Sequence, residues 1–504
     1  MKRVIKRAVS FVLVFMTVFS VFTILPSEVF HTAYVKAAEM FSSETGASAQ
    51  ETYTTDDFTY TLIDEYSKVQ ILSYIGSDTD VVIPDRIDNK KVTSIADSAF
   101  REKSITSVVF GQYVESIGNY AFFSCQSLNK LDFSKSSVKT IGKYAFTVCK
   151  SLESIEFPDS LESIGYGAFS AYTDGYGGYW GSYVASSLKS VKFGSGLKSI
   201  ADYAFYENRA LNTVKFTGIA LTSIGYQSFY NIAITELDLS GADASIGTYA
   251  FYNCNSLETV KLSGVKTIGQ NAFYNCRKLT SVELSENLTT IESGAFQSCV
   301  ALKNIDIPNK VTKLNGNTFG NCISLKNVSI GSGCTSISSS AFLNSNAIEK
   351  ITVAEDNKNY TVVDGVLYNK DMTTLVLYPK NRSGEFTVPD TVTTIAVYAF
   401  DNSPNLTKVT IGKNVKTIGT SAFGECKSLK TVIFKDSDTV QKTIGDYAFN
   451  NCPVLTTVDF GNAVKSIGNY AFISCQSLNK LDFSKNSVKT IGKYAFTVCK
   501  SLES

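Results

Sequence analysis

One short sequence unit recurs through most of this 504-residue chain. Its second copy reads SIGNYAFFSCQSL over residues 116–128, and close variants end at Leu211, Leu257, Leu279 and Leu429. A single copy is too short to bury its own apolar residues, so successive copies have to stack on one another. The repeat therefore predicts a solenoid, and it overrides the prior of about three globular domains that chain length alone would suggest.

The phenylalanine at the Ala-Phe position marks each copy of the unit. Successive markers lie 22 to 26 residues apart, except for gaps of 36 residues after Phe169 and 58 residues after Phe342. Two insertions, residues 170–187 and 354–390, account for the long gaps. The sixteen markers are Phe100, Phe122, Phe146, Phe169, Phe205, Phe229, Phe251, Phe273, Phe296, Phe319, Phe342, Phe400, Phe423, Phe449, Phe472 and Phe496.

The residues after each marker alternate as they do in a β-strand. In the second copy Cys125 and Leu128 follow the marker, and then Leu131 and Phe133 point to one side with polar residues between them. Strands stacked in the same direction form a parallel sheet with one strand per coil. We expect a leucine-rich-repeat solenoid of about 16 coils of ~23 residues. Its parallel β-sheet should lie on the concave face, and it should contain few or no long helices.

The full pattern has the form AF-x-x-C-x-x-L, two alternating apolar residues, and then V-x-x-I-G before the next AF. This pattern resembles the BspA-type leucine-rich repeat, also called the Treponema pallidum type, and residues 92–504 match it throughout. The resemblance implies secreted or surface-attached proteins that bind matrix proteins, other microbes or host cells. As a rule, such proteins are not catalytic.

The first 37 residues predict a secretory signal peptide. Basic residues precede an apolar run over residues 9–25, and Val35-Lys36-Ala37 provides a cleavage site. A membrane anchor is the alternative, because the run of 17 residues is just long enough to span a bilayer. Pro26 and the cleavage site favour a cleaved signal, so we expect a secreted mature chain without membrane insertion.

Three further segments complete the predicted domain organisation. Residues 38–57 are rich in Ser, Thr and Glu and predict a disordered spacer. Residues 58–91 contain short alternating apolar runs and predict a β cap for the first coil. Residues 466–504 repeat residues 116–154 with two differences, and the chain stops before its next strand is complete. We therefore expect a truncated reading frame or a fragment of a longer protein.

Composition argues against an enzyme. His31 is the only histidine and lies in the predicted signal peptide, so a mature chain has no Ser-His or Cys-His pair and no imidazole for zinc. The 47 basic and 46 acidic residues give no reason to expect a nucleic acid partner. We expect no catalytic residue, no metal and no cofactor.

Cysteines recur three residues after the marker. Asn208, Ser345 and Ser403 take this position in other coils, which indicates a small polar group bonded to backbone. We expect a ladder of free thiols, with disulfides or a metal as the alternative. The eleventh cysteine, Cys334, is expected in a turn. The ladder comprises Cys125, Cys149, Cys254, Cys276, Cys299, Cys322, Cys426, Cys452, Cys475 and Cys499.

The first insertion is the best candidate for a binding site, because glycines separate its aromatic residues and core packing does not explain them. Exposed Tyr and Trp dominate binding hot spots and sugar-stacking sites. A loop that packs its own rings against the solenoid is the alternative. The candidate ligand-binding residues are Tyr172, Tyr176, Tyr179, Trp180 and Tyr183.

Three other features have mainly structural interpretations. In the second insertion Asp364-Gly365 predicts a hairpin and TTLVLYP another strand, together forming an island on the edge of the solenoid. The outward column of the sheet carries mixed charges from Asp132 to Asp482. This predicts a solvent-exposed ladder of charged residues or, as the alternative, a contact with a protein partner of complementary charge. Eight of the markers have a tyrosine two residues before them, and we predict that these tyrosines are half-buried parts of the scaffold.

The sequence therefore predicts a secreted or cell-surface protein that mediates recognition of, or adhesion to, an extracellular protein or glycan without catalysis. The alternative is a structural spacer, or the repeat region of a larger secreted protein or hydrolase whose functional domain lies beyond residue 504.

Overall fold

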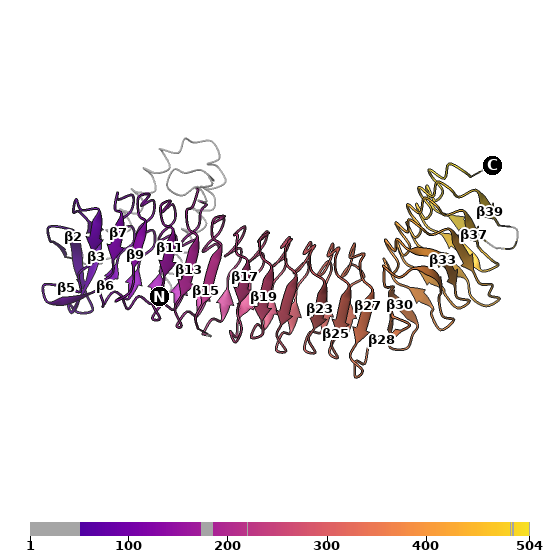
Figure 1. Cartoon of the computed structure of the whole chain (residues 1–504), viewed down its shortest axis with the longest axis horizontal. Coiled ribbons are helices and arrows are strands. Elements are labelled where there is room, and N and C mark those ends of the chain that lie inside the picture. Colours follow the sequence, from indigo (N-terminus) through magenta and orange to yellow (C-terminus); the bar gives the residue numbers. More distant parts are fainter. Residues whose placement is uncertain (1–50, 173–184, 219, 484, 486–487, 503–504) are drawn as a thin grey trace, which may run out of the picture. The chain divides into compact units, whose positions relative to one another are not determined.

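The computed structural model describes residues 51–172, 185–218, 220–483, 485 and 488–502. Within these residues the regular elements are all β-strands (Figure 1). Strand β9 (Lys130–Asp132) shows how the sequence specifies each coil, because Leu131 is buried while its two neighbours turn outward. The predicted parallel-sheet solenoid is confirmed.

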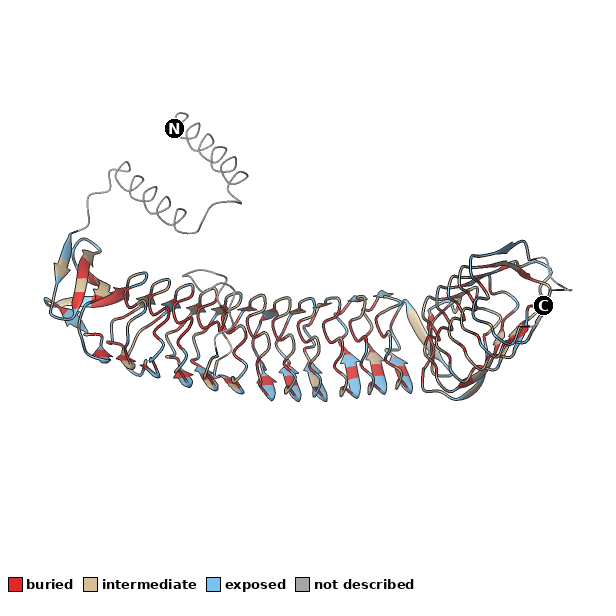
Figure 2. Cartoon of the chain, turned by 90° about the horizontal axis from the view of Figure 1, so that it is seen from above, coloured by how far each residue is buried: buried red, intermediate tan, exposed pale blue. Residues whose placement is uncertain are grey.

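The first strand of each coil pairs in parallel with its counterpart in at least one adjacent coil, for instance Val108 with Leu131. These strands form successive sheets of three to five strands. Buried residues line the inside of the coils (Figure 2). These strands are β7 (Ser107–Val109), β9, β11 (Ser154–Glu156), β13 (Ser190–Phe193), β15 (Thr213–Phe216), β17 (Glu236–Asp238), β19 (Thr259–Leu262), β21 (Ser281–Leu284), β23 (Asn304–Ile307), β25 (Asn327–Ile330), β27 (Lys350–Val353), β31 (Gly384–Thr387), β33 (Leu406–Ile411), β35 (Thr431–Phe434), β37 (Thr457–Asp459) and β39 (Lys480–Asp482).

A second, usually shorter strand precedes each marker phenylalanine from Phe122 onward and also pairs in parallel, for instance Ile141 with Ile164. These strands are β8 (Ser116–Ile117), β10 (Thr140–Ile141), β12 (Ser163–Ile164), β14 (Ser199–Ile200), β16 (Ser223–Ile224), β18 (Ser245–Ile246), β20 (Thr267–Ile268), β22 (Thr290–Ile291), β24 (Lys313–Leu314), β26 (Ser336–Ile337), β32 (Thr394–Ile395), β34 (Thr417–Ile418), β36 (Lys442–Ile444), β38 (Val464–Ile467) and β40 (Thr490–Ile491).

The marker phenylalanines form a buried stack that runs from coil to coil. Phe122 and Phe146, for example, have ring centroids 4.9 Å apart and planes 3° apart. The backbone around each marker alternates in handedness, with Tyr120 at φ 55° and Ser124 at φ 60°. This alternation lets the N–H groups of Tyr120, Phe122 and Ser124 all donate to carbonyls of the next coil, at 2.8–2.9 Å. The turn face thus has its own ladder of hydrogen bonds between coils.

The N-terminal cap contains β1 (Thr52–Thr54), β2 (Phe58–Ile63), β3 (Lys68–Tyr74), β4 (Asp80–Val82), β5 (Arg86–Ile87) and β6 (Lys90–Ile95). Strands β2 and β3 form an antiparallel pair, and β3 pairs in parallel with β6. Strand β1 lies inside the segment predicted as a disordered spacer. That prediction is wrong for residues 52–54, whose Thr-Tyr-Thr sequence favours a strand.

Tyr74 joins this cap to the first coil. Its ring stacks on Phe100, with centroids 5.4 Å apart, and its N–H donates to the Ala99 carbonyl at 2.9 Å. The cap therefore presents the first coil with the same ring and backbone contacts that a preceding coil would provide.

The second insertion forms β28 (Tyr360–Val363), β29 (Val366–Asn369) and β30 (Thr374–Leu377). The predicted hairpin is confirmed, because β28 and β29 are antiparallel and Asp364 and Gly365 have φ of 48° and 76°. The prediction of an island on the edge is wrong, because β30 pairs in parallel with β32 and leads into the next coils.

Tyr378 makes the same two contacts as Tyr74. Its ring stacks on Phe400, with centroids 4.6 Å apart, and its N–H donates to the Ala399 carbonyl at 2.9 Å. A buried apolar cluster begins at Val366 and continues through the following coils. The second insertion is therefore a second cap, which starts a second run of coils.

Candidate functional site

The loop in the first insertion begins at an ordered tyrosine. Of the five predicted ligand-binding residues only Tyr172 lies among the described residues; the others, Tyr176, Tyr179, Trp180 and Tyr183, lie outside them. The half-buried Tyr172 ring lies 5.8 Å from the Tyr206 ring, edge to face at 71°.

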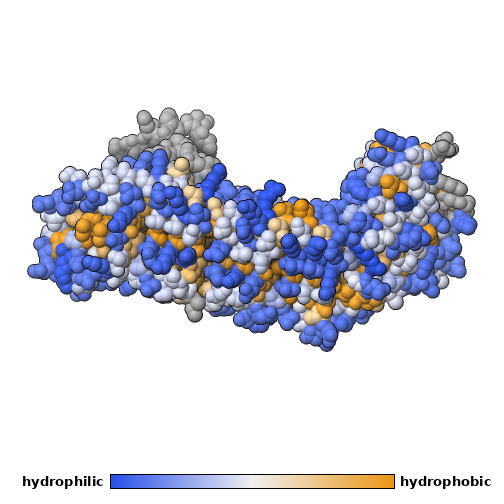
Figure 3. Space-filling view, in the orientation of Figure 1, coloured by the Kyte–Doolittle hydropathy of each residue, from blue (hydrophilic) through white to orange (hydrophobic). Residues whose placement is uncertain are grey.

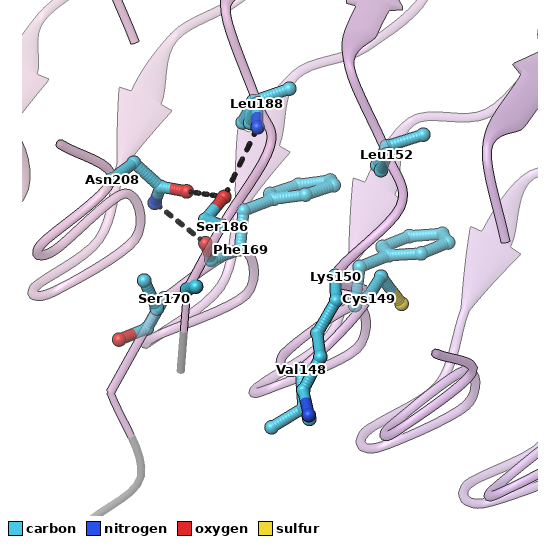
Figure 4. Close-up of a pocket in the computed structure, with 12 residues that line it drawn as sticks. Val148, Cys149, Lys150, Leu152, Phe169, Ser170, Ser186, Leu188 and Asn208 are labelled. Atoms are coloured by element: carbon cyan, nitrogen blue, oxygen red, sulfur yellow. Dashed lines mark hydrogen bonds between the residues drawn. The ribbon is translucent and has the colours of Figure 1, made fainter. Parts of the chain in front are cut away.

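The other end of this insertion is held by polar contacts (Figure 4). The Asn208 amide donates to the Phe169 carbonyl at 2.8 Å, and its oxygen accepts from the Ser186 hydroxyl at 2.6 Å. The N–H of Leu188 donates to the same hydroxyl at 3.2 Å. The cavity here measures about 20 Å³, which holds about one water molecule. These residues anchor the insertion and do not form a ligand pocket.

The cysteine column lies inside the coils. Each Sγ of the ten-residue ladder lies 3.0–3.4 Å from the carbonyl oxygen of the marker phenylalanine in the preceding coil, as Cys125 does with Phe100. Asn208 and Ser345 donate to the equivalent carbonyls at 2.8 and 2.6 Å. Burial raises the pKa of Cys125 to about 12, which keeps the thiol protonated as a hydrogen-bond donor.

All eleven cysteines are free thiols in this structure. Cys334 was expected in a turn, and its side chain is buried in the core, where Val138 stands in the second coil. Its sulfur lies 3.7 Å from the Ser336 carbonyl. The turn prediction is confirmed, because the N–H of Cys334 donates to the Gly331 carbonyl at 3.4 Å and closes a turn. Cys334 also begins the apolar pair Cys334-x-x-Ile337, which places its side chain in the core.

The outward column of the strands carries ion pairs between neighbouring coils. Lys192 pairs with Glu156, and Lys261 lies 3.7 Å from Asp238. All four side chains are at least half exposed, so the pairs add little stability. The column from Val109 to Asp459 mixes both charges with Thr, Ser and Ile, and it offers no single chemistry to a ligand.

Two rows of tyrosines run along the turn face. In the first row the ring centroids of successive residues are 5.2–5.8 Å apart and their planes differ by 36–89°. In the second row the centroids are 4.7–4.9 Å apart and the planes differ by 2–28°. The first row consists of Tyr120, Tyr144, Tyr166, Tyr203, Tyr226 and Tyr249, and the second of Tyr206, Tyr230, Tyr252 and Tyr274.

The two rows form one surface. Tyr203 contacts Tyr206 at 5.4 Å between centroids, and Tyr249 contacts Tyr252 at 5.5 Å. Apart from the buried Tyr144, these side chains are half-buried. Burial and the neighbouring phenols raise the pKa of Tyr203 to about 12, so the phenol is neutral at physiological pH. Because Tyr172 packs on Tyr206, the first insertion leaves the solenoid at the edge of this surface.

Sequence reasoning found only part of the tyrosine surface. It identified Tyr120, Tyr144, Tyr203 and Tyr249, two residues before their markers, as scaffold. It missed Tyr166 and Tyr226, which lie three residues before their markers. It also missed the second row, although a tyrosine directly after the marker in four consecutive coils was a readable signal.

Two findings concern the residues that the structure describes. In that part of the chain, His, Cys, Asp and Glu side chains do not gather in groups of three or more that could bind a metal ion. The same residues form no helix long and apolar enough to cross a bilayer. On the face shown in Figure 3, hydrophilic residues predominate and apolar residues appear in patches between them.

Comparison with known proteins gives a family and a set of similar folds. A family model described as a BspA type leucine rich repeat region, six copies, matches residues 80–174, 181–266, 244–372 and 378–503. A leucine-rich repeat protein from Bacteroides ovatus has a similar structure, with a TM-score of 0.53 and 22% identity over 87% of this chain and 99% of that one. No curated protein matches the sequence.

Two other solved structures resemble the chain at lower scores. A leucine rich cell surface protein from Faecalibacterium prausnitzii shares 23% identity over 91% of this chain and 95% of that one, with a TM-score of 0.40. A leucine-rich repeat protein from T. pallidum shares 23% identity over 50% of this chain and 91% of that one, with a TM-score of 0.28.

Proposed function

The chain belongs to the BspA-type leucine-rich repeat family, and from that premise we propose that it is a secreted or cell-surface recognition protein. In this proposal it binds an extracellular protein or glycan and catalyses no reaction. The matched repeats cover most of the chain, which supports a function carried by the repeats themselves.

The tyrosine surface is the observation that carries this proposal. Tyrosine supplies a large, rigid contact area and a polar group in one side chain, which is why it is enriched in binding surfaces. The phenylalanine stack already fills the core, so the half-buried rings of Tyr206, Tyr230 and Tyr252 are additional aromatic surface at the outside of the coils.

We include the first insertion in the same binding region. Its aromatic residues, Tyr172, Tyr176, Tyr179, Trp180 and Tyr183, follow directly from the edge of the tyrosine surface. The contact between Tyr172 and Tyr206 supports this assignment, because it anchors the start of the loop beside the second row.

A binding panel tests the proposal. The chain without residues 1–37 is immobilised and exposed to soluble glycans and to purified matrix proteins, with a heat-unfolded sample as the control for non-specific adhesion. We expect the folded chain to retain at least one ligand that the unfolded chain does not. Equal binding by the folded and unfolded samples to every ligand would contradict the proposal.

The loop is tested separately with Tyr179→Ala/Trp180→Ala. If the insertion takes part in binding, this double variant binds the retained ligand more weakly than the wild type. Equal binding would remove the loop from the site and leave the tyrosine rows as the candidate surface.

A further inference from the structure

We propose that the two tyrosine rows bind an uncharged polysaccharide that lies along the coils, with about one sugar unit facing each coil. This inference rests on the proposed recognition function and names the class of its ligand and the surface that binds it.

The repeat distance of the surface suits a polymer. Each coil contributes one tyrosine to a row, and ring centroids advance by 4.7–4.9 Å in the second row and 5.2–5.8 Å in the first. A sugar unit in an extended polysaccharide has a similar length. A chain of sugars aligned with the rows can therefore repeat the same contact from coil to coil.

The orientation of the rings provides two kinds of contact. Rings in the second row stack nearly face to face, so Tyr230, Tyr252 and Tyr274 turn edges rather than faces outward. First-row rings are tilted, by 89° between Tyr226 and Tyr249, so the edge of one ring meets the next and covers less of its face than a parallel ring would. Apolar sugar faces pack on aromatic rings, whereas sugar hydroxyls exchange hydrogen bonds with phenols.

The centre of this surface lacks charge. Residues 225–232, 247–255 and 269–276 include no Asp, Glu, Lys or Arg. Amide side chains accompany the rings there instead, and the Asn275 amide donates to the Asn253 oxygen at 2.8 Å. Amides offer both donors and acceptors, as sugar hydroxyls do. The amide residues of these three coils are Gln227, Asn231, Asn253, Asn255, Gln270, Asn271 and Asn275.

The lack of charge discriminates between ligand classes. A nucleic acid or a sulfated glycan requires lysines and arginines for its anionic groups. Protein partners are usually steered by complementary charges. Charged groups approach the surface outside the three central coils, where the Lys143 ammonium lies over the Tyr144 and Tyr166 rings, 5.0 and 5.1 Å from their centroids. The Glu207 carboxylate, in the coil before the central three, accepts from the Asn231 amide at 3.0 Å. A neutral, hydroxyl-rich polymer matches the three central coils best.

The fold does not require the tyrosine rows. The next coils stack equally well, with Phe296 and Phe319 5.6 Å apart and 2° from parallel. In those coils Gln297 and Gly320 stand where the second row would continue. A surface that stops while the solenoid continues indicates a local function.

The test uses Tyr230→Gln/Tyr252→Gln in the otherwise complete mature chain. Gln297 shows that this position accepts glutamine without loss of the fold. Tyr447→Gln/Tyr470→Gln is the matched control, because these rings also stack, 4.9 Å apart, but lie in the second run of coils. Circular dichroism and the melting temperature of each variant verify that it remains folded.

Native gels containing dissolved hydroxyethylcellulose, xyloglucan, galactomannan or glycogen measure binding to neutral polysaccharides. Heparin gels and immobilised fibronectin and collagen measure the other ligand classes. We expect at least one neutral polysaccharide to retard the wild type and the control variant equally. The Tyr230/Tyr252 variant should bind about tenfold more weakly, which corresponds to the loss of two hydrogen-bonded phenol contacts.

Three results would overturn the inference. Equal retardation of the Tyr230/Tyr252 variant and the wild type would show that the rows are not the site. Binding only to heparin or to a protein would refute the ligand class while leaving the recognition function in place. If the chain binds nothing in any gel or on any immobilised protein, the recognition function fails as well.

Discussion

Tyr74 and Tyr378 occupy the same position in the two caps, but their hydroxyl groups have different surroundings. The Tyr74 hydroxyl donates to the Asp78 carbonyl at 2.8 Å. The Tyr378 hydroxyl is buried and has no hydrogen-bond partner among the described residues. Both rings stack on a marker phenylalanine, so a change to phenylalanine keeps the stack and removes only the hydroxyl.

The two substitutions should therefore have opposite effects on stability. Tyr378→Phe removes a buried hydroxyl whose lost hydration costs about 1–3 kcal/mol, so it should stabilise the second cap by about 1 kcal/mol. Tyr74→Phe removes a satisfied hydrogen bond and should destabilise the first cap by about 1 kcal/mol. By contrast, Tyr378→Ala would leave a cavity beneath Phe400 and should cost about 3–5 kcal/mol.

Hydrogen exchange followed by mass spectrometry can measure both effects in the complete chain. The method is needed because runs of repeats can open locally without global unfolding. We expect slower exchange in peptides covering residues 378–400 for Tyr378→Phe, and faster exchange in peptides covering residues 74–100 for Tyr74→Phe. A shift of the same sign in both caps would refute the reasoning from hydroxyl satisfaction.

Three further predictions follow from buried polar side chains, each measured by urea unfolding. Cys276→Ala should cost about 1–2 kcal/mol, because it removes the thiol bonded to the preceding coil, and Cys276→Ser should cost less, since serine makes the equivalent bond at residue 345. A thiol titration of the denatured, unreduced chain that finds far fewer than the 11 cysteines would indicate disulfides instead. Lys442→Met should cost about 2–3 kcal/mol, because the buried ammonium donates to three carbonyls at 2.6–3.3 Å. The exposed Lys416, at the same coil position, provides the control, and equal costs for both changes would contradict the role of these bonds. Burial raises the pKa of Asp401 to about 6, above the ordinary pKa of 3.8 that its carboxyl has in the unfolded chain. Between these two pH values the folded chain therefore holds a proton on Asp401 that the unfolded chain has lost. The stability of the wild type relative to Asp401→Asn should therefore fall as the pH rises from 3.8 to about 6, and a pH-independent difference would contradict this.

The fold was predictable because the same residues repeat at the same spacing. Leu131 and Phe133 alternate with polar residues, and Phe122 recurs as a marker, so strand direction and stacking follow from a single coil. The second cap was harder to recognise. Its hairpin could be predicted from Asp364-Gly365. The sequence did not show that Tyr378 takes the place of a marker phenylalanine, because this depends on its contact with Phe400 in the next coil.

The binding surface was less predictable than the fold because it depends on neighbours in space. Tyr230 and Tyr252 are 22 residues apart in sequence, and only stacking brings their rings within 4.9 Å. The aromatic residues of the first insertion stand out in the sequence because they interrupt the repeat. Tyrosines that recur within the repeat instead resemble scaffold, and their accessible edges become apparent only in the folded chain.

The backbone beneath the first row distinguishes scaffold from surface. Tyr249 has φ 57°, a left-handed conformation that costs an L-residue other than glycine, asparagine or aspartate about 1–2 kcal/mol. Asn271, at the same position in the next coil, avoids much of that cost. In two coils Gly167 and Gln227 hold the left-handed position, and the tyrosine moves one residue earlier, to Tyr166 and Tyr226. Both rings nevertheless remain in the row, 5.2–5.8 Å from their neighbours. These coils therefore keep a tyrosine ring at the same place in space, although the tyrosine does not occupy the same position in the repeat. Stacking contributes about 0.5–1.5 kcal/mol per ring pair, which is similar to the cost of the left-handed backbone. Stability alone therefore does not explain why the tyrosine row is present.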